Sequence, residues 1–167
     1  RLMVPDGLAI RPTLDRVREA LFSILGPRLA GARFLDCFAG SGANGIEAMS
    51  RGAEQAVFVD ADRRAIDAVR DNLQRARLAK HAMCLDLGLP AGLARVPGPF
   101  DIVFADPPHD FEDYTGFLAA VDTHGVLATG GLLVVEHSRR RTLADAVGGL
   151  ERTRAARYGE TTLSFYS

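Results

Sequence analysis

Five short runs of apolar and β-branched residues recur along the chain, separated by segments of helical periodicity. The runs are Arg33–Phe38, Gln55–Val59, Ala82–Leu85, Phe100–Ala105 and Leu132–Glu136. Strands buried on both faces of a parallel sheet form such near-continuous apolar runs, and helices connect them. The alternation therefore predicts an α/β fold with five parallel strands.

The segments between the runs place apolar residues three and four positions apart. Over residues 62–77, Ile66, Val69 and Leu73 lie on one face, and Asp62 stands where a helix N-cap is expected. This spacing predicts an amphipathic helix. Similar patterns predict further helices at 15–25, 44–51, 112–124 and 141–148.

The end of the chain has the period of two that is typical of antiparallel strands. Glu151–Tyr158 and Thr162–Tyr166 are joined across Gly159, and we expect a terminal hairpin. Together with the five parallel strands it gives a seven-stranded, doubly wound, Rossmann-like sheet. No linker or repeat interrupts residues 1–167, so a single domain is expected.

The amino-acid composition narrows the class of protein but does not indicate what reaction or ligand it has. The chain has 167 residues, 47% hydrophobic and 25% charged, with a net charge of −1, which excludes a disordered or collagen-like protein and leaves nucleic-acid binding undecided. No apolar run reaches the ~20 residues of a membrane span, and the start lacks a signal peptide's apolar core, so a cytoplasmic protein is expected. Cys37 and Cys84 have neither disulfide nor zinc spacing, and no metal is expected.

A glycine-rich loop follows the first predicted strand directly. Gly40, Gly42 and Gly45 form a G-x-G-x-x-G turn that opens a helix, and Asp60 stands 20 residues after Gly40 at the end of the second strand. Glycine allows a tight turn and close approach of the backbone to a ligand, and the carboxylate can accept hydrogen bonds from a ribose diol. Both NAD sites and adenosylmethionine sites need these features, so the loop alone does not choose the cofactor.

Two further carboxylates favour adenosylmethionine. Asp36 stands at the mouth of the first strand, where dinucleotide folds usually keep the run apolar, and it is a candidate partner for the cationic amino group of a methionine moiety. Asp86 ends the third strand and is a candidate acceptor for an adenine amine. Asp36 in particular favours an adenosylmethionine site over an NAD site.

The fourth strand leads into Asp106-Pro107-Pro108-His109. The two prolines fix the backbone and remove two N–H donors, which leaves a stiff loop rich in carbonyl acceptors. Such a loop can hold an NH₂ group between the Asp106 carboxylate and the Pro107 carbonyl. Pulling on the amine hydrogens restores the nitrogen lone pair for attack on an electrophilic methyl group, with alignment supplying most of the acceleration.

These motifs resemble those of a known family. Asp36-x-Phe38-x-Gly40-x-Gly42 and Asp106-Pro107-Pro108 are similar to class I adenosylmethionine-dependent amino-methyltransferases that act on bases. With the segments 11–22, 134–137 and 157–161, the chain resembles the RsmD family, which methylates a guanine N2 in small-subunit (16S) ribosomal RNA. The resemblance implies that S-adenosyl-L-methionine is bound by Asp36, Phe38, Gly40, Gly42, Asp60 and Asp86, and that Asp106 and Pro107 hold the guanine amine.

The chain departs from the family pattern in two places. The fourth position of the catalytic loop is usually Tyr or Phe, whose ring stacks on the target base, and here it is His109. A neutral imidazole is flat enough to stack, so His109 is expected to keep this role. The family also usually carries a basic, glycine-rich segment before the region of Val4 and Pro5, and we expect a substrate-binding arm to be missing from the sequence in hand.

The expected partner is 16S ribosomal RNA within a small-subunit particle, bound by a monomer. Arg11 and Thr13 flank a proline before the first predicted helix, where a stiff loop can close over a cofactor or a flipped base. Arg16 and Pro108 complete the predicted substrate contacts. Further candidate phosphate contacts are Arg18, Arg139, Arg140, Arg141, Arg152, Arg154 and Arg157.

Alternatives from other classes remain open. A DNA adenine-N6 or cytosine-N4 methyltransferase shares both motifs, but it usually carries a target-recognition domain for which this chain has no room. A methyltransferase for a small amine or a protein side chain could use the same loop. An NAD-dependent oxidoreductase is supported by the glycines and Asp60, and His109 raises the possibility of a catalytically silent RNA-binding module.

Overall fold

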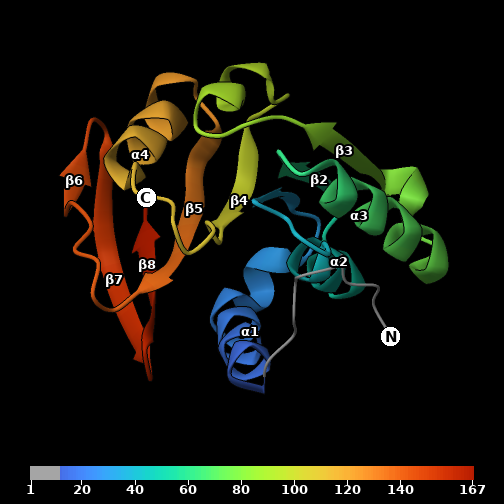
Figure 1. Ribbon diagram of the computed structural model, residues 1–167, viewed down its shortest axis with the longest axis horizontal. Coiled ribbons are helices and arrows are strands. Elements are labelled where there is room, and N and C mark those ends of the chain that lie inside the picture. The colour runs from blue at the N-terminus through green and yellow to red at the C-terminus, as the bar shows by residue number, and fades with distance from the viewer. Residues whose placement is uncertain (1–11) are drawn as a thin grey trace.

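One mixed sheet of eight strands runs through the computed structural model, in which residues 12–167 are described and side chains from residue 15 onward (Figure 1). The strand order is β3-β2-β1-β4-β5-β8-β7-β6. The five parallel strands are β1 (Arg33–Cys37), β2 (Gln55–Asp60), β3 (Ala82–Asp86), β4 (Phe100–Ala105) and β5 (Leu127–Ser138). The predicted α/β class and the parallel strands are therefore confirmed.

Strand β1 lies at the centre of the parallel part, between β2 and β4. It pairs in parallel with both, with Cys37 beside Val59 on one side and Ala105 on the other. The carboxyl ends of β1, β2 and β4 thus meet at one edge of the sheet. Chain connections diverge from β1 in both directions, and ligands of doubly wound sheets bind at this kind of switch point.

The antiparallel part contains one strand more than the sequence predicts. The expected hairpin is present as β7 (Leu150–Tyr158) and β8 (Thr161–Tyr166), with β8 paired to β5. The prediction of a helix at 141–148 is wrong. This segment contains the short strand β6 (Ala146–Val147), which pairs with the start of β7.

Contacts with distant residues explain why residues 141–148 do not form a helix. A turn at Gly148 and Gly149 follows β6 immediately, and the Gly149 N–H donates to the Asp122 carboxylate at 3.1 Å. The Arg152 side chain pairs with Asp145 across the same turn. These contacts, which join segments distant in sequence, override the helix-like spacing of the apolar residues.

Helices cover both faces of the sheet (Figure 1). Buried side chains of α1 (Pro12–Leu25), α2 (Ala43–Ser50) and α3 (Arg63–Ala76) pack on one face, and those of α4 (Tyr114–Thr123) pack on the other. Short 3₁₀ turns lie at Gly26–Leu29, Ala79–His81 and Ala91–Arg95. The doubly wound arrangement is confirmed. None of the helices in the described part of the chain is long and apolar enough to cross a membrane.

Helix α2 packs unusually close to strand β2. Gly45 faces the ring of Phe58, and a Cβ on Gly45 would lie within 3 Å of two ring atoms. Both residues are buried, so the ring has little room to move. The absence of a side chain at Gly45 therefore sets the distance between the helix and the sheet.

We predict that Gly45→Ala destabilises the protein by about 1–3 kcal/mol, the usual cost of overpacking a core. Alanine favours a helix over glycine by about 1 kcal/mol, so helix propensity alone predicts the opposite sign. Urea unfolding followed by circular dichroism measures the difference.

Gly88→Ala is the matched control, because a Cβ there meets nothing within 4 Å. Its free energy of unfolding should stay within about 0.5 kcal/mol of the wild type. Equal or greater stability of Gly45→Ala would contradict the proposed contact with Phe58.

Candidate active site

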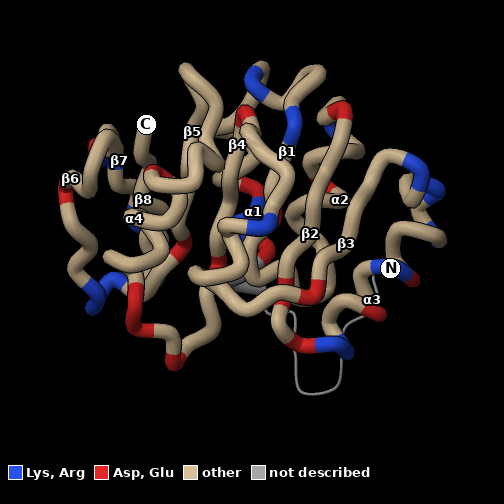
Figure 2. The backbone as a smooth tube through the Cα atoms, turned by 90° about the horizontal axis from the view of Figure 1, so that it is seen from above, with Lys and Arg blue, Asp and Glu red and all other residues tan. Residues whose placement is uncertain are grey.

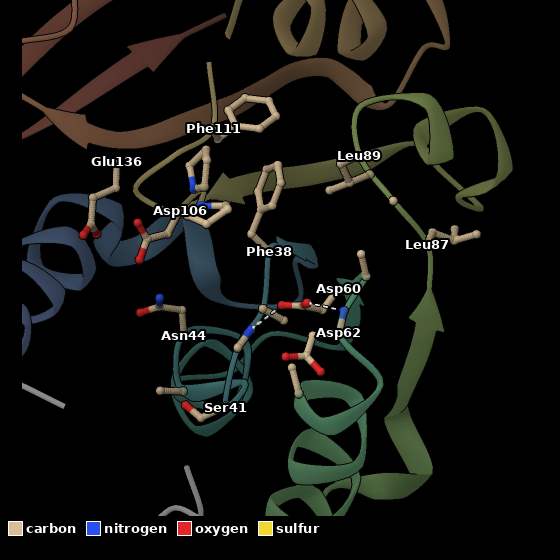
Figure 3. A pocket seen from close by; sticks show the side chains of 18 of the residues that line it. Phe38, Ser41, Asn44, Asp60, Asp62, Leu87, Leu89, Asp106, Phe111 and Glu136 are labelled. Carbon is tan, nitrogen blue, oxygen red and sulfur yellow. Dashed lines mark hydrogen bonds between the residues drawn. The ribbon is translucent and has the colours of Figure 1, made fainter. Parts of the chain in front are cut away.

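A cavity of about 640 Å³ opens at the carboxyl edge of the parallel strands (Figure 3). Its walls come from the loop after β1, the end of β2, the segment after β3 and the loop after β4. Residues of three helices and one strand complete the lining, namely Arg18 of α1, Ala43 and Asn44 of α2, Ala65 of α3 and Glu136 of β5. The volume lies within the range of small-molecule and cofactor sites.

The loop after β1 is shaped by three residues with positive φ. Phe38 and Gly40 both have φ 58°, and Gly42 has φ 81°. Glycine adopts this region freely, but Phe38 does so at a steric cost, and such strain is concentrated at functional sites. The loop thereby directs Phe38, Gly40 and Ser41 to the cavity.

Asp36 holds this loop from beneath. Gly42 occupies the N-cap of α2 and has no side chain to cap the helix. The Asp36 carboxylate instead accepts the N–H of Gly45, in the first turn of α2, at 2.9 Å. A residue of β1 therefore satisfies a free donor of the helix N-terminus.

Asp36 is only 1% exposed. Burial raises the pKa of its carboxyl group well above the usual value; the hydrogen bond from Gly45 opposes this shift, and the charges of Asp106 and Asp60 add to it. Neither Asp36 nor Gly42 is among the cavity-lining residues. The structure thus gives Asp36 a supporting contact, and its predicted contact with a cofactor stays a prediction.

Asp60 faces the cavity at the end of β2. One oxygen accepts the Gly40 N–H at 3.0 Å and the other accepts the Asp62 N–H at 2.8 Å (Figure 3). Each carboxylate oxygen has a second lone pair, so Asp60 can still accept from a ligand hydroxyl. The carboxylate both fixes the glycine loop and keeps acceptor capacity for a ribose.

The wall beyond Asp60 is apolar. Leu87 and Leu89, in the segment that follows β3, line the cavity together with Gly88. The predicted residue Asp86 is exposed at the end of β3 and is not part of the lining. Leu87 and Leu89 are lining residues that the sequence reasoning did not single out, and the predicted contact of Asp86 with a cofactor stays a prediction.

The loop after β4 closes the opposite end of the cavity. Asp106, Pro107 and Pro108 all line it, and the Pro108 carbonyl accepts the N–H of Phe111 at 2.9 Å, which folds the loop into a turn. Burial raises the pKa of Asp106 to about 7. A carboxyl group of this kind is well suited to proton exchange near neutral pH.

Aromatic rings connect this loop to the glycine loop. The ring centroids of Phe38 and Phe111 are 5.2 Å apart in an edge-to-face arrangement, and Phe117 of α4 lies 5.9 Å from Phe38. His109, which the sequence places as a stacking ring, is exposed and is not among the lining residues. Phe111 is the aromatic residue that this loop contributes to the cavity wall.

Four polar residues in the cavity lining, Ser41, Asn44, Asp62 and Glu136, were not predicted as site residues. Glu136, in β5, is 9% exposed, and burial together with the nearby charge of Asp106 raises its pKa to about 8. The Oδ1 of Asn44 is buried without a hydrogen-bond partner among the described residues. A signal for Glu136 was present, since it is an acidic residue at the end of the apolar run Leu132–Val135.

The predicted substrate contacts are placed only in part. Arg11 lies outside the described residues, and Thr13 is described only by its backbone in α1. Arg16 is exposed on α1 and does not line the cavity, whereas Arg18, two residues later, does. The Arg18 guanidinium donates to Asp15 at 3.0 Å.

Comparison with known proteins identifies the family. The model of the family described as "Conserved hypothetical protein 95" matches residues 1–167. The putative rRNA methyltransferase YlbH of Bacillus subtilis is 41% identical over 164 residues, covering 96% of this chain and 89% of its own length. Ribosomal RNA small subunit methyltransferase D of Escherichia coli is 40% identical over 136 residues, or 81% of this chain and 68% of its own.

A solved structure agrees with the sequence relatives. The putative methyltransferase YhhF of Escherichia coli superposes with a TM-score of 0.84 at 35% identity, covering 99% of this chain and 89% of that one. The predicted fold is thus confirmed, with eight strands in place of seven. The chain belongs to the RsmD family of class I, S-adenosylmethionine-dependent methyltransferases, the family that its motifs predict.

Proposed function

We propose that the protein transfers a methyl group from S-adenosylmethionine to the exocyclic N2 amine of a guanine in small-subunit (16S) ribosomal RNA. The observation that carries this proposal is that Asp106-Pro107 and the Asp60-held glycine loop line one cavity. Asp106 and Pro107 would hold an amine, and the glycine loop with Asp60 would hold a nucleoside cofactor, so the two proposed sites share one cavity. The names of the relatives, an rRNA methyltransferase and a small-subunit rRNA methyltransferase, support the class of substrate.

The residues of the cavity fit the cofactor. Asp60 offers acceptors for a ribose diol, and Leu87 and Leu89 offer an apolar wall for an adenine ring. The unsatisfied Oδ1 of Asn44 would be satisfied by a donor such as an ammonium group. When bound, the cofactor supplies an electrophilic methyl group on a sulfonium that leaves as a neutral thioether.

Asp106 and Pro107 prepare the nucleophile. The lone pair of an exocyclic base amine is delocalised into the ring, so the free amine is a poor nucleophile. The Asp106 carboxylate and the Pro107 carbonyl can each accept one amine hydrogen, which aligns the lone pair with the methyl group. Methyl transfer leaves one proton too many on the nitrogen, and Asp106, with its raised pKa, is placed to accept that proton.

Charged positions of both signs are spread over the molecule. Basic and acidic positions are interspersed along the chain (Figure 2), in keeping with the net charge of −1. Arg139 pairs with Glu160 at 3.0 Å, and the Arg141 guanidinium lies 5.5 Å from the centre of the Tyr114 ring. Arg139 and Arg141 thus already have contacts within the protein, and a broad basic surface is not expected from the net charge. We therefore propose that a few arginines, including Arg140, position the RNA by its phosphates.

The substrate is proposed to be a small-subunit particle with the target guanine flipped out of its stack. The base amine must reach the cavity, which a stacked base cannot do. The enzyme is proposed to act in the cytoplasm as a monomer, without a metal ion. Arg11, Thr13, Arg16 and Pro108 remain the proposed substrate contacts.

We predict that Asp106→Ala lowers transfer by at least about 100-fold, the effect of removing a group that acts in the transition state. The measurement is tritium transfer from labelled S-adenosylmethionine to small ribosomal subunits that lack the guanine-N2 modification. Digestion of the RNA should yield label in N2-methylguanosine for the wild type.

Asp110→Ala is the matched control, an exposed acid in the same loop that does not line the cavity. It should retain wild-type transfer and the wild-type Kd for S-adenosylmethionine, and calorimetry should show that Asp106→Ala still binds the cofactor. Wild-type protein that binds the cofactor but labels no guanosine would refute the proposed substrate.

The pH dependence should follow the ionisation of Asp106. Its folded pKa is about 7, and the protonated carboxyl group is a poorer acceptor and no base. We therefore predict that kcat/KM rises about tenfold per pH unit below pH 7 and levels off above it. Asp106→Asn should be slow with no such slope, and a wild-type profile that is flat from pH 5.5 to 7 would contradict this role.

His109 is predicted to stack on the target base from the exposed end of the catalytic loop. His109→Ala should then lower kcat/KM for small subunits about tenfold, within the range measured for single stacking contacts, without changing the Kd for the cofactor. Phe111→Ala tests the other aromatic residue of the loop. Unchanged turnover and substrate affinity in His109→Ala would show that the imidazole does not stack.

A further inference from the structure

Two carboxyl groups lie side by side at the amine end of the cavity. Strands β4 and β5 pair in parallel with Ala105 beside Val135, so the next residues, Asp106 and Glu136, are neighbours across the sheet. Both residues line the cavity, and Figure 3 shows both carboxyl groups at this end of it. The charge of Asp106 acts directly on Glu136.

Among the described residues, Glu136 has no partner that explains its burial. No hydrogen bond or ion pair joins its side chain to another side chain or backbone group in the part of the chain that the structure describes. Arg18 lines the same cavity, but its guanidinium is bonded to Asp15. A buried acid that no described residue pairs with costs stability, so its presence in a site wall points to a donor that arrives with a ligand.

The groups around this pair include both donors and acceptors. Asp36 of β1 and Asp106 interact, and so do Tyr114 of α4 and Asp106. Asn44 of α2 presents an amide, and Arg18 of α1 is the one cation among the described lining residues. Two acidic side chains in such surroundings suit a ligand edge that carries two adjacent donors.

Among the RNA bases, guanine presents an amine beside a ring N–H on its pairing edge. Its N2 amine and N1–H are adjacent donors. In adenine and in cytosine the amine stands beside a ring nitrogen that carries a lone pair and can only accept. Flipped bases are read by hydrogen bonds to this edge, so the two patterns are distinguishable.

We propose that Glu136 is the specificity-determining residue, which accepts the N1–H of guanine while Asp106 accepts its N2 amine. This inference rests on the proposed function and names the feature that selects guanine over the other base amines. If the two carboxyl groups hold a proton between them, each still keeps one free acceptor oxygen, so both contacts can form. Adenine or cytosine would place a lone pair against Glu136, and a site whose buried polar group is left unpaired in this way can reject a substrate by about 10⁴-fold.

The test removes the N1–H, together with the O6 oxygen whose loss leaves N1 with a lone pair. 2-Aminopurine keeps the 2-amine of guanine but has a lone pair at N1. After the target guanine has been mapped in the transfer assay, small subunits are reassembled with 2-aminopurine at that position. We expect the wild type to methylate 2-aminopurine at least about 100-fold more slowly than guanine.

Glu136→Gln should shift this preference, because the side-chain amide can accept from guanine N1–H or donate to the N1 of 2-aminopurine. The variant should lose about tenfold on guanine, and its guanine to 2-aminopurine rate ratio should fall below about 10. Glu151→Gln, an exposed acid on β7, is the control and should keep the wild-type ratio. Cofactor binding by calorimetry checks that each variant is folded.

Each outcome decides between the proposals. A wild type that methylates 2-aminopurine as fast as guanine overturns the N1–H contact, whatever the variants do. An equal rate ratio in the wild type and a folded Glu136→Gln assigns the selection to another residue. A wild type that makes no N2-methylguanosine on unmodified small subunits overturns the proposed function itself, and this inference with it.

Discussion

The hydrogen bond from the Gly45 N–H to the buried Asp36 carboxylate is the contact on which the site depends. It ties the carboxyl end of the central strand to the first turn of α2, and residues of the loop between them line the cavity. Asp60 fixes the same loop from β2 through the Gly40 N–H. Because Gly45 also sets the distance of α2 from Phe58, one glycine serves both packing and loop geometry.

Acidic side chains gather in the wall of the cavity and directly beneath it, in partly buried positions where proteins usually avoid charge. Asp36, Asp60, Asp106 and Glu136 all lie at the carboxyl ends of neighbouring strands, and burial raises the pKa of three of them. Their mutual repulsion disfavours the empty site. A cofactor with positive charge on its sulfonium and ammonium groups relieves that repulsion, so the same acids that destabilise the free protein favour this class of ligand.

Much of the fold can be predicted from local sequence patterns, and much of the candidate site from the residues at the predicted strand ends. The five parallel strands, the helix after Asp62, the glycine loop and the Asp106 loop are all visible in the sequence, because apolar periodicity and Gly and Pro positions are local signals. Strand β6 is not visible, since a distant carboxylate, Asp122, holds its turn. The partnership of Asp106 with Glu136 also depends on strand order, which no local pattern records.

The outer edge of strand β7 bears on aggregation. Strand β6 covers only the first two residues of β7, so the remainder of β7 is an open sheet edge. Arg152, Arg154 and Arg157 lie along that edge, and charged side chains on edge strands prevent pairing with a second sheet. The arginines that suggest phosphate contacts in the sequence therefore have a second physical role that needs no RNA, because positive charge along an open edge disfavours its pairing with another strand.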